Sequence, residues 1–197
     1  MIWFARHGET PHNREGRLQG RVDLELSEQG LDQARRLAAR FRGLEVARVV
    51  SSPLRRATQT AAAIAAVCGV DVEVDDRLIE LDYGDWDGRL LSELRPERGS
   101  GWMRDPAFAP PGGESLVDVT RRVEAFCRDR LAPAEGGIVA VSHVSPIKAA
   151  VAWALGVDER ATLRMQLELA SITTVGARAD GTGYLVSFND SAHLARV

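Results

Sequence analysis

The sequence is poor in cysteine, and this scarcity limits how the fold is held together. Its 197 residues include only two cysteines, Cys68 and Cys127. Both lie in segments with helical patterning, so we interpret them as free, buried or half-buried thiols and not as a functional pair. A chain of this length can bury a substantial core without disulfides or a metal ion. A cytoplasmic location fits this cysteine usage.

Long apolar runs and an excess of charge are also missing. No stretch approaches the roughly 20 apolar residues of a membrane span, and the N-terminus lacks the pattern of a signal peptide. We therefore expect a protein that is neither secreted nor inserted into a membrane. The formal net charge is -3 and the pI is about 5.8, which argues against binding to nucleic acid or to an anionic membrane surface. Any anion site must be a local concentration of arginine and histidine.

What the chain does contain is an alternation of strand and helix patterns. Its 45% hydrophobic and 27% charged residues are typical of a globular protein. Strands are predicted at 1–5, 46–50, 70–74, 138–141, 171–175 and 184–188, and helices at 31–41, 54–67, 114–131 and 147–155. This order predicts an α/β fold of three layers, α/β/α, with a mostly parallel central sheet. We expect one domain over residues 1–197.

Local signals predict where the helices begin and end. Ser27 is the expected N-cap of the first long helix, and Gly43 is expected to end it. Pro53 is predicted at the first position of the next helix, and Gly69 after its last turn.

One stretch interrupts the alternation. Residues from about 82 to 111 form an irregular insertion, which we interpret as a flap over the active site. Trp86 and Trp102 lie within it and are expected to pack in the core or in the flap rather than to stack on a ligand.

Basic and imidazole side chains follow the predicted strands. The first strand ends in Arg6-His7, the fourth ends in Ser142-His143, and the helix after the second carries Arg55-Arg56. The carboxyl ends of parallel strands meet at one edge of a sheet, where ligands bind. Guanidinium groups and a helix N-terminus suit a phosphate dianion, and an imidazole among them can attack phosphorus. Nucleophilic catalysis through a phosphohistidine is therefore chemically reasonable at this edge.

Several blocks of sequence, in order along nearly the whole chain, carry a family resemblance. They are Arg6-His7-Gly8-Glu9-Thr10 with Asn13, Gly16-Arg17-Leu18-Gln19-Gly20, the run 51–61, Leu78-Ile79-Glu80, Gly84-Asp85-Trp86-Asp87-Gly88, Gly112-Gly113-Glu114-Ser115, Ser142-His143 and the run 189–194. This ordered set resembles the histidine phosphatase (phosphoglycerate mutase-like) superfamily, in particular its phosphatase branch. The resemblance implies a phosphoglycerate mutase-like fold.

The resemblance also implies roles for individual residues. His7 would be the nucleophile that takes the phosphoryl group. Arg6, Arg56 and His143 would hold the phosphate, and Asn13 would add a neutral donor. Because the family places its pocket arginine directly before an alanine, Arg56 is selected and the preceding arginine is interpreted as a solvated neighbour.

Glu80 would be the general acid that protonates the leaving oxygen and then the base that activates water. Glu9, Asp82 and Asp85 are rival carboxylates for this role. The resemblance implies no metal and no cofactor, because the protein's own cations neutralise the phosphate.

Substrate contacts are expected from Gln19 and Gly20, for which a simple turn is an equal alternative, and from the backbone amide of Val144. Here the chain departs from the family, which usually has glycine after the second histidine. A valine cannot adopt dihedral angles that only glycine reaches. We expect Pro146 to open the helix that follows.

We interpret the protein as a phosphomonoesterase that acts on a small phosphorylated metabolite. One alternative is a phosphoglycerate mutase, which passes the phosphoryl group to another hydroxyl. A second alternative is a module that binds a phosphorylated ligand without turnover. The oligomeric state stays open, with a homodimer as one candidate.

Overall fold

The computed structural model describes residues 1–94, 105–131 and 136–195. Its centre is a six-stranded sheet in the order β3-β2-β4-β1-β5-β6. Neighbouring strands are parallel from β3 to β1, whereas β5 runs antiparallel to β1 and β6 antiparallel to β5. The strands are β1 (Ile2–Arg6), β2 (Val46–Ser51), β3 (Val72–Val74), β4 (Gly137–Ser142), β5 (Ile172–Ala177) and β6 (Gly183–Asp190).

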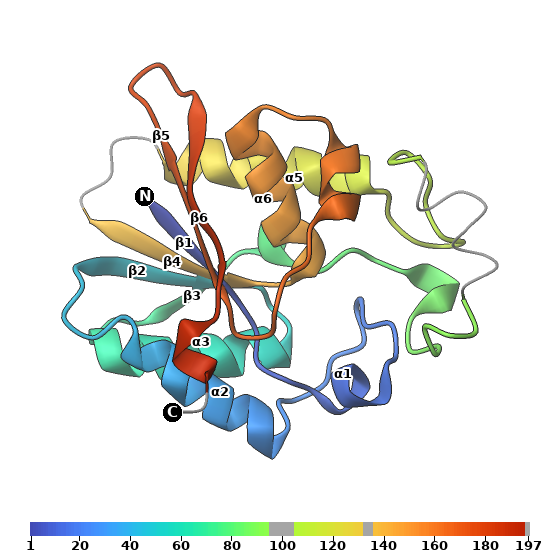
Figure 1. Ribbon diagram of the computed structural model, residues 1–197, viewed down its shortest axis with the longest axis horizontal. Helices are drawn as coiled ribbons and strands as arrows, with labels where there is room; N and C mark the ends of the chain where they lie inside the picture. Colours follow the sequence, from blue (N-terminus) through green and yellow to red (C-terminus); the bar gives the residue numbers. More distant parts are fainter. Residues whose placement is uncertain (95–104, 132–135, 196–197) are drawn as a thin grey trace.

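Two pairs of helices cover the two faces of this sheet, which confirms the predicted three-layer α/β/α fold (Figure 1). Helices α2 (Glu28–Ala39) and α3 (Arg55–Cys68) lie on one face, and α5 (Leu116–Arg130) and α6 (Val144–Leu155) lie on the other. A short helix, α1 (Pro11–Glu15), follows β1, and short 3-10 helices occupy Asp76–Leu78, Gly84–Trp86, Glu159–Arg164 and Ala192–Leu194. None of the described helices combines the length and apolar character that crossing a bilayer requires.

The central strands are apolar at nearly every position because they serve two cores. Ile138 and Ala140 of β4 point into the core under α5 and α6, while Val139 and Val141 point into the core under α2 and α3. Successive side chains of a strand face opposite sides of the sheet. The uninterrupted run 138–141 therefore predicts a strand buried on both faces, and β4 does lie between β2 and β1.

Helix boundaries agree with the sequence signals in part. Ser27 caps α2 by accepting a hydrogen bond from the Gly30 amide at 3.1 Å, and Gly69 ends α3 in the left-handed conformation. The prediction that Gly43 ends α2 is wrong, because this helix ends at Ala39. The next amides, from Arg40 and Phe41, bond three residues back, which tightens the chain into a turn before Gly43.

The predicted starts of α3 and α6 are also displaced. Helix α3 begins at Arg55, not at Pro53, because the Asp23 carboxylate from another loop accepts the Arg55 amide at 2.6 Å. Helix α6 begins at Val144, so that Pro146 is its third residue rather than its first. In both cases a long-range contact, which local sequence does not contain, satisfies the first amides of the helix.

The described parts of the insertion pack against the loop after α1. The Leu18 amide donates to the Arg89 carbonyl at 2.9 Å, and the Gly88 amide donates to the Leu18 carbonyl at 2.9 Å. Trp86 is buried, with its ring centroid 5.9 Å from that of Phe108, in line with the expected packing role. Trp102 lies outside the described residues.

Candidate active site

The site begins with two histidines delivered by adjacent strands. In the ladder between β1 and β4, Arg6 lies opposite Ser142, so His7 and His143 leave the sheet side by side. The His7 amide donates to the Ser142 carbonyl at 3.1 Å, and the two imidazole centroids lie 5.0 Å apart. Both side chains are buried. Sheet topology alone therefore joins two histidines that are far apart in sequence.

His7 is held with one ring nitrogen free. Its Nδ1 lies 2.7 Å from the Gly8 carbonyl oxygen. Because a carbonyl only accepts, Nδ1 carries the hydrogen and Nε2 keeps its lone pair. Burial lowers the pKa of His7 well below its usual value, and the positive charges of Arg56 and Arg6 lower it further. The imidazole is thus neutral and suited to act as a nucleophile.

Arg56 is a fully buried cation that organises the second histidine. Its Nη1 and Nη2 donate to the carbonyls of Val22 and Gly20 at 2.8 and 2.7 Å, and its Nε donates to His143 Nδ1 at 3.2 Å. His143 Nε2 therefore carries the hydrogen and donates to Ser52 Oγ at 2.7 Å. Burial lowers the pKa of Arg56 to about 10, against the opposing effect of Glu80.

The pKa of His143 is also lowered well below its usual value, first by burial and then by Arg56, His7 and Arg6. Arg6 donates through Nη1 to the Leu167 carbonyl, while its buried Nε has no hydrogen-bond partner among the described residues. Burial lowers the pKa of Arg6 to about 10. A buried positive region with an unpaired donor favours an anionic ligand.

Glu80 lies on the same side of the site. Its Oε1 accepts from the amides of Leu81 at 2.8 Å and Ser145 at 3.2 Å, and its Oε2 accepts from the Val144 amide at 3.0 Å. The carboxylate therefore binds the N-terminus of α6, where the helix dipole favours negative charge. Val144 belongs to this helix, so its backbone needs no glycine-only dihedral angles.

The other carboxylates considered for the role of general acid are bound elsewhere or lie outside the cavity. Glu9 accepts from the Ser27 hydroxyl at 2.7 Å, and Asp82 accepts from the Gly84 amide at 2.9 Å. Neither of them, nor Asp85, lines the cavity that His7 and Glu80 share. Arg55 is exposed and forms an ion pair with Glu25, which agrees with its interpretation as a solvated neighbour of the site.

A cavity of about 290 Å³ is lined by Arg6, His7 and Glu80, whereas Arg56 and His143 are not among its lining residues. Asn13, Gln19 and Val144, from which substrate contacts are expected, line it, although the Val144 amide donates to Glu80. Gln19 accepts from the Thr10 hydroxyl at 2.7 Å, which leaves its buried Nε2 without a partner in the described part of the chain. Gly20 does not line this cavity; it contributes the carbonyl that holds Arg56.

The cavity is also lined by side chains to which the sequence analysis assigns no role. Arg17 and Lys148 add positive charge, and Tyr83, Leu91, Leu116 and Leu163 add apolar surface. Lys148 is half-buried, and burial lowers its pKa despite the nearby Glu80. The one sequence signal for a role of Lys148 in the cavity is that a lysine stands on the otherwise apolar face of its helix.

Two glycines set the path of the loop that carries His7. A Cβ atom on Gly8 would lie 2.4 Å from the Gly30 carbonyl oxygen, and one on Gly30 would lie 2.1 Å from the Glu9 carbonyl oxygen. The loop therefore passes against α2 at a distance that only glycine allows. Gly30 has no signal in the local pattern, because its partner lies about 20 residues away.

Buried guanidinium groups and neutral imidazoles at the carboxyl edge of a mostly parallel sheet define an α/β protein with a site suited to an anionic ligand. The model that describes the histidine phosphatase superfamily (branch 1) matches residues 2–191. The chain belongs to this superfamily.

Relatives of two kinds are similar to the chain in sequence. A bifunctional protein of Mycobacterium tuberculosis (strain ATCC 25618 / H37Rv) is 39% identical over 201 residues, which cover 98% of this chain and 54% of that protein. The chain thus spans about half the length of the first curated relatives it matches. A protein of Enterobacter sp. (strain 638), named probable phosphoglycerate mutase GpmB, is 35% identical, with 98% of this chain and 94% of that protein covered.

Solved structures of phosphatases are similar over the full fold. A mycobacterial glucosyl-3-phosphoglycerate phosphatase in complex with VO3 aligns with a TM-score of 0.88 and 32% identity, covering 96% of this chain and 99% of that one. A phosphoserine phosphatase from Entamoeba histolytica, in complex with 3-phosphoglyceric acid, aligns with a TM-score of 0.88 and 30% identity, covering 98% of each chain. The family and its structural neighbours thus support a phosphatase enzyme.

Proposed function

We propose that the protein is a phosphomonoester hydrolase that acts through a phosphohistidine at His7. The observation that carries this proposal is the state of His7, a neutral imidazole whose Nδ1 is bound to the Gly8 carbonyl and whose Nε2 is free. Arg6, which lines the cavity with an unpaired Nε, and Arg56, through the positive charge that it holds beside His143, would neutralise the phosphate oxygens. Such pre-arranged donors act most strongly in a site from which water is excluded.

The reaction would proceed in two transfers. In the first, Nε2 of His7 forms a bond to phosphorus while the bond to the ester oxygen breaks. Glu80 gives a proton to that oxygen from its acid form, which has to form against the three amides that favour the carboxylate. In the second, the Glu80 carboxylate takes a proton from water, whose oxygen bonds to phosphorus as the bond to His7 breaks. Asn13 and His143 would hold the remaining phosphate oxygens, and to do so His143 would give up the hydrogen bond from its Nε2 to Ser52 Oγ.

The cavity supports a small substrate. Its volume of about 290 Å³ is at the lower end of ligand pockets and leaves room for a small phosphorylated metabolite. Tyr83 and Leu91, from the insertion, form part of its wall. This placement supports a role for the insertion as a flap over the bound substrate.

The direct test is hydrolysis of p-nitrophenyl phosphate in the presence of EDTA. We expect the wild-type protein to release phosphate without added metal, and His7→Ala to abolish this. Trapping of an acid-labile phosphoryl group on His7 would establish the intermediate. A label on another residue would refute the assignment, and loss of activity in EDTA that added Mg²⁺ restores would refute metal independence.

Phosphoglycerate mutase activity is the second candidate, because a relative with 35% identity carries that name. A mutase shares the first transfer and differs only in the acceptor of the phosphoryl group. Conversion of 3-phosphoglycerate to 2-phosphoglycerate faster than its hydrolysis would favour the mutase. A folded wild type that binds inorganic phosphate but hydrolyses no phosphomonoester would favour a binding module.

A further inference from the structure

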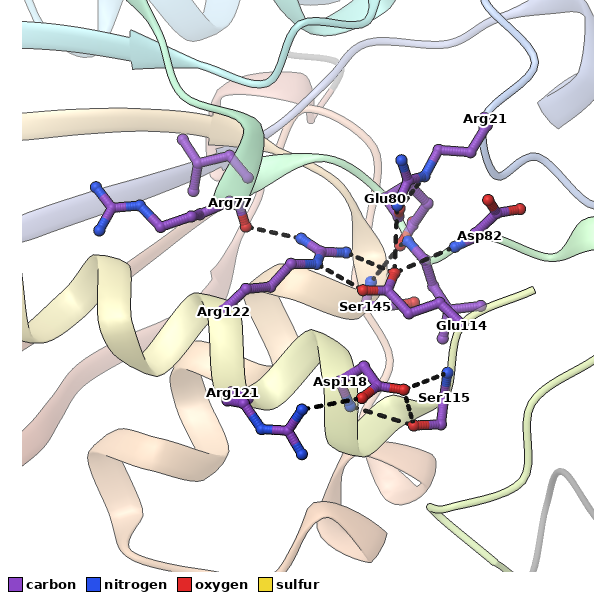
Figure 2. A network of polar contacts seen from close by, with 12 residues as sticks. Arg21, Arg77, Glu80, Asp82, Glu114, Ser115, Asp118, Arg121, Arg122 and Ser145 are labelled. Carbon is purple, nitrogen blue, oxygen red and sulfur yellow. Dashed lines mark hydrogen bonds and ion pairs between the residues drawn. The ribbon is translucent and has the colours of Figure 1, made fainter. Parts of the chain in front are cut away.

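The backbone on both sides of Glu80 is hydrogen-bonded to an ion pair between Arg122 and Glu114 (Figure 2). Arg122 of α5 binds the Glu114 carboxylate through two parallel contacts, Nε to Oε1 at 2.9 Å and Nη2 to Oε2 at 3.0 Å. Its third nitrogen, Nη1, donates to the Arg77 carbonyl at 2.7 Å. The Arg122 and Glu114 side chains are only 17% and 16% exposed. The guanidinium therefore fixes the backbone three residues before Glu80.

The other partner of this pair fixes the backbone after Glu80. The Glu114 amide donates to the Asp82 carbonyl at 2.8 Å, and the Glu114 carboxylate lies 3.4 Å from the Asp82 amide. Arg21 links the backbone of Glu80 to the Glu114 side chain. Its Nε donates to the Glu80 carbonyl at 3.1 Å, and its Nη2 lies 3.5 Å from the Glu114 carboxylate. The backbone of the proposed acid is thus held before, at and after its own position.

These charged groups have no place in the phosphate pocket. Neither Arg21, Glu114 nor Arg122 lines the cavity of His7. A largely buried ion pair contributes little net stability, because desolvation offsets most of the attraction. Its geometry can still orient a reactive group, because a fork bound at both ends allows little movement.

We infer that Glu114 and Arg122, with Arg21, are positioning residues that set the distance between the Glu80 carboxyl group and the leaving oxygen. The inference rests on the proposed hydrolase function. Its consequence is selective, because a general acid matters most when the leaving group is a poor one. p-Nitrophenolate leaves without a proton, whereas the alkoxide of β-glycerophosphate requires one. Phosphate binding itself depends on Arg6, Arg56 and the histidines.

The test compares kcat/KM for these two substrates, because this parameter reports the transfer in which the leaving oxygen departs. We expect Arg122→Ala to lower kcat/KM for β-glycerophosphate by about 10- to 100-fold, and that for p-nitrophenyl phosphate by less than about threefold. Inhibition by inorganic phosphate should stay unchanged. Arg122→Lys keeps one charge without the fork and should restore part of the loss, and Glu114→Gln should show the same selectivity as Arg122→Ala.

Two further variants separate positioning from a general loss of structure. Arg121→Ala removes the neighbouring arginine, which is 74% exposed and pairs with Asp118 on the surface, and it should leave both substrates unaffected. Glu80→Gln gives the full loss for an absent acid, and adding Arg122→Ala to it should cause little more. Equal losses for both substrates, or full additivity with Glu80→Gln, would overturn the inference. A wild type that hydrolyses neither substrate would instead overturn the proposed function.

Discussion

The buried histidine pair predicts that the folded protein loses stability as the pH falls below 6.5. His7 and His143 both have pKa values well below the ordinary value of 6.5, chiefly because of burial. Unfolding returns each imidazole to water and to its ordinary pKa. Below pH 6.5 the unfolded chain therefore binds protons that the folded chain does not, so the free energy of unfolding decreases with falling pH.

The size of the stability loss follows from the ordinary histidine pKa in the unfolded chain and from imidazoles that stay neutral in the folded one. Between pH 7.5 and 5.5, an imidazole that stays neutral in the folded state contributes a loss of about 1.4 kcal/mol, and the pair contributes about 3 kcal/mol. Carboxylates titrate mostly below this window. His193 is half-buried against the Ala170 carbonyl, and burial lowers its pKa as well, which adds a loss of the same sign.

Urea unfolding followed by tryptophan fluorescence measures this directly at a series of pH values. We expect His7→Gln and His143→Gln each to remove about half of the loss that the pair contributes, whereas His12→Gln, outside the pair, should retain it. Saturating inorganic phosphate should reduce the loss, because a bound anion stabilises the protonated imidazoles. A free energy of unfolding that is independent of pH between 7.5 and 5.5 would refute the reasoning.

Three other predictions concern single side chains. Arg56→Lys replaces a fork that serves three buried acceptors with one ammonium, so the inhibition constant of inorganic phosphate should rise about tenfold or more in steady-state assays. Lys148→Met removes a half-buried cation from the cavity wall; KM should rise about threefold or more, while the midpoint of thermal unfolding should not fall. Gly30→Ala places a methyl group 2.1 Å from the Glu9 carbonyl oxygen, so urea unfolding should show a loss of about 3 kcal/mol. An unchanged inhibition constant for Arg56→Lys, an unchanged KM for Lys148→Met or an unchanged free energy of unfolding for Gly30→Ala would contradict the corresponding contact.

The strands and the histidines could be predicted because their signals are local. The run 138–141 is apolar at every position, as a strand that lies between two cores requires. A polar histidine directly after such a strand has to lie at the carboxyl edge of the sheet. The same holds for His7 after β1. The bounds of α2, α3 and α6 were less predictable, because contacts from distant segments satisfy their terminal amides.

By itself, the sequence determined the alternation of elements, the three-layer fold and the set of side chains gathered at one sheet edge. The tertiary structure alone decided how these side chains are used. It pairs Arg56 with His143 and so fixes which nitrogen carries the hydrogen, directs the Val144 amide to Glu80, and brings Lys148 to the cavity. It also brings Arg122 and Glu114 together and bonds Arg122 to the backbone just before Glu80. Hydrogen bonds and desolvation depend on distances between residues remote in sequence, and only the folded chain sets those distances.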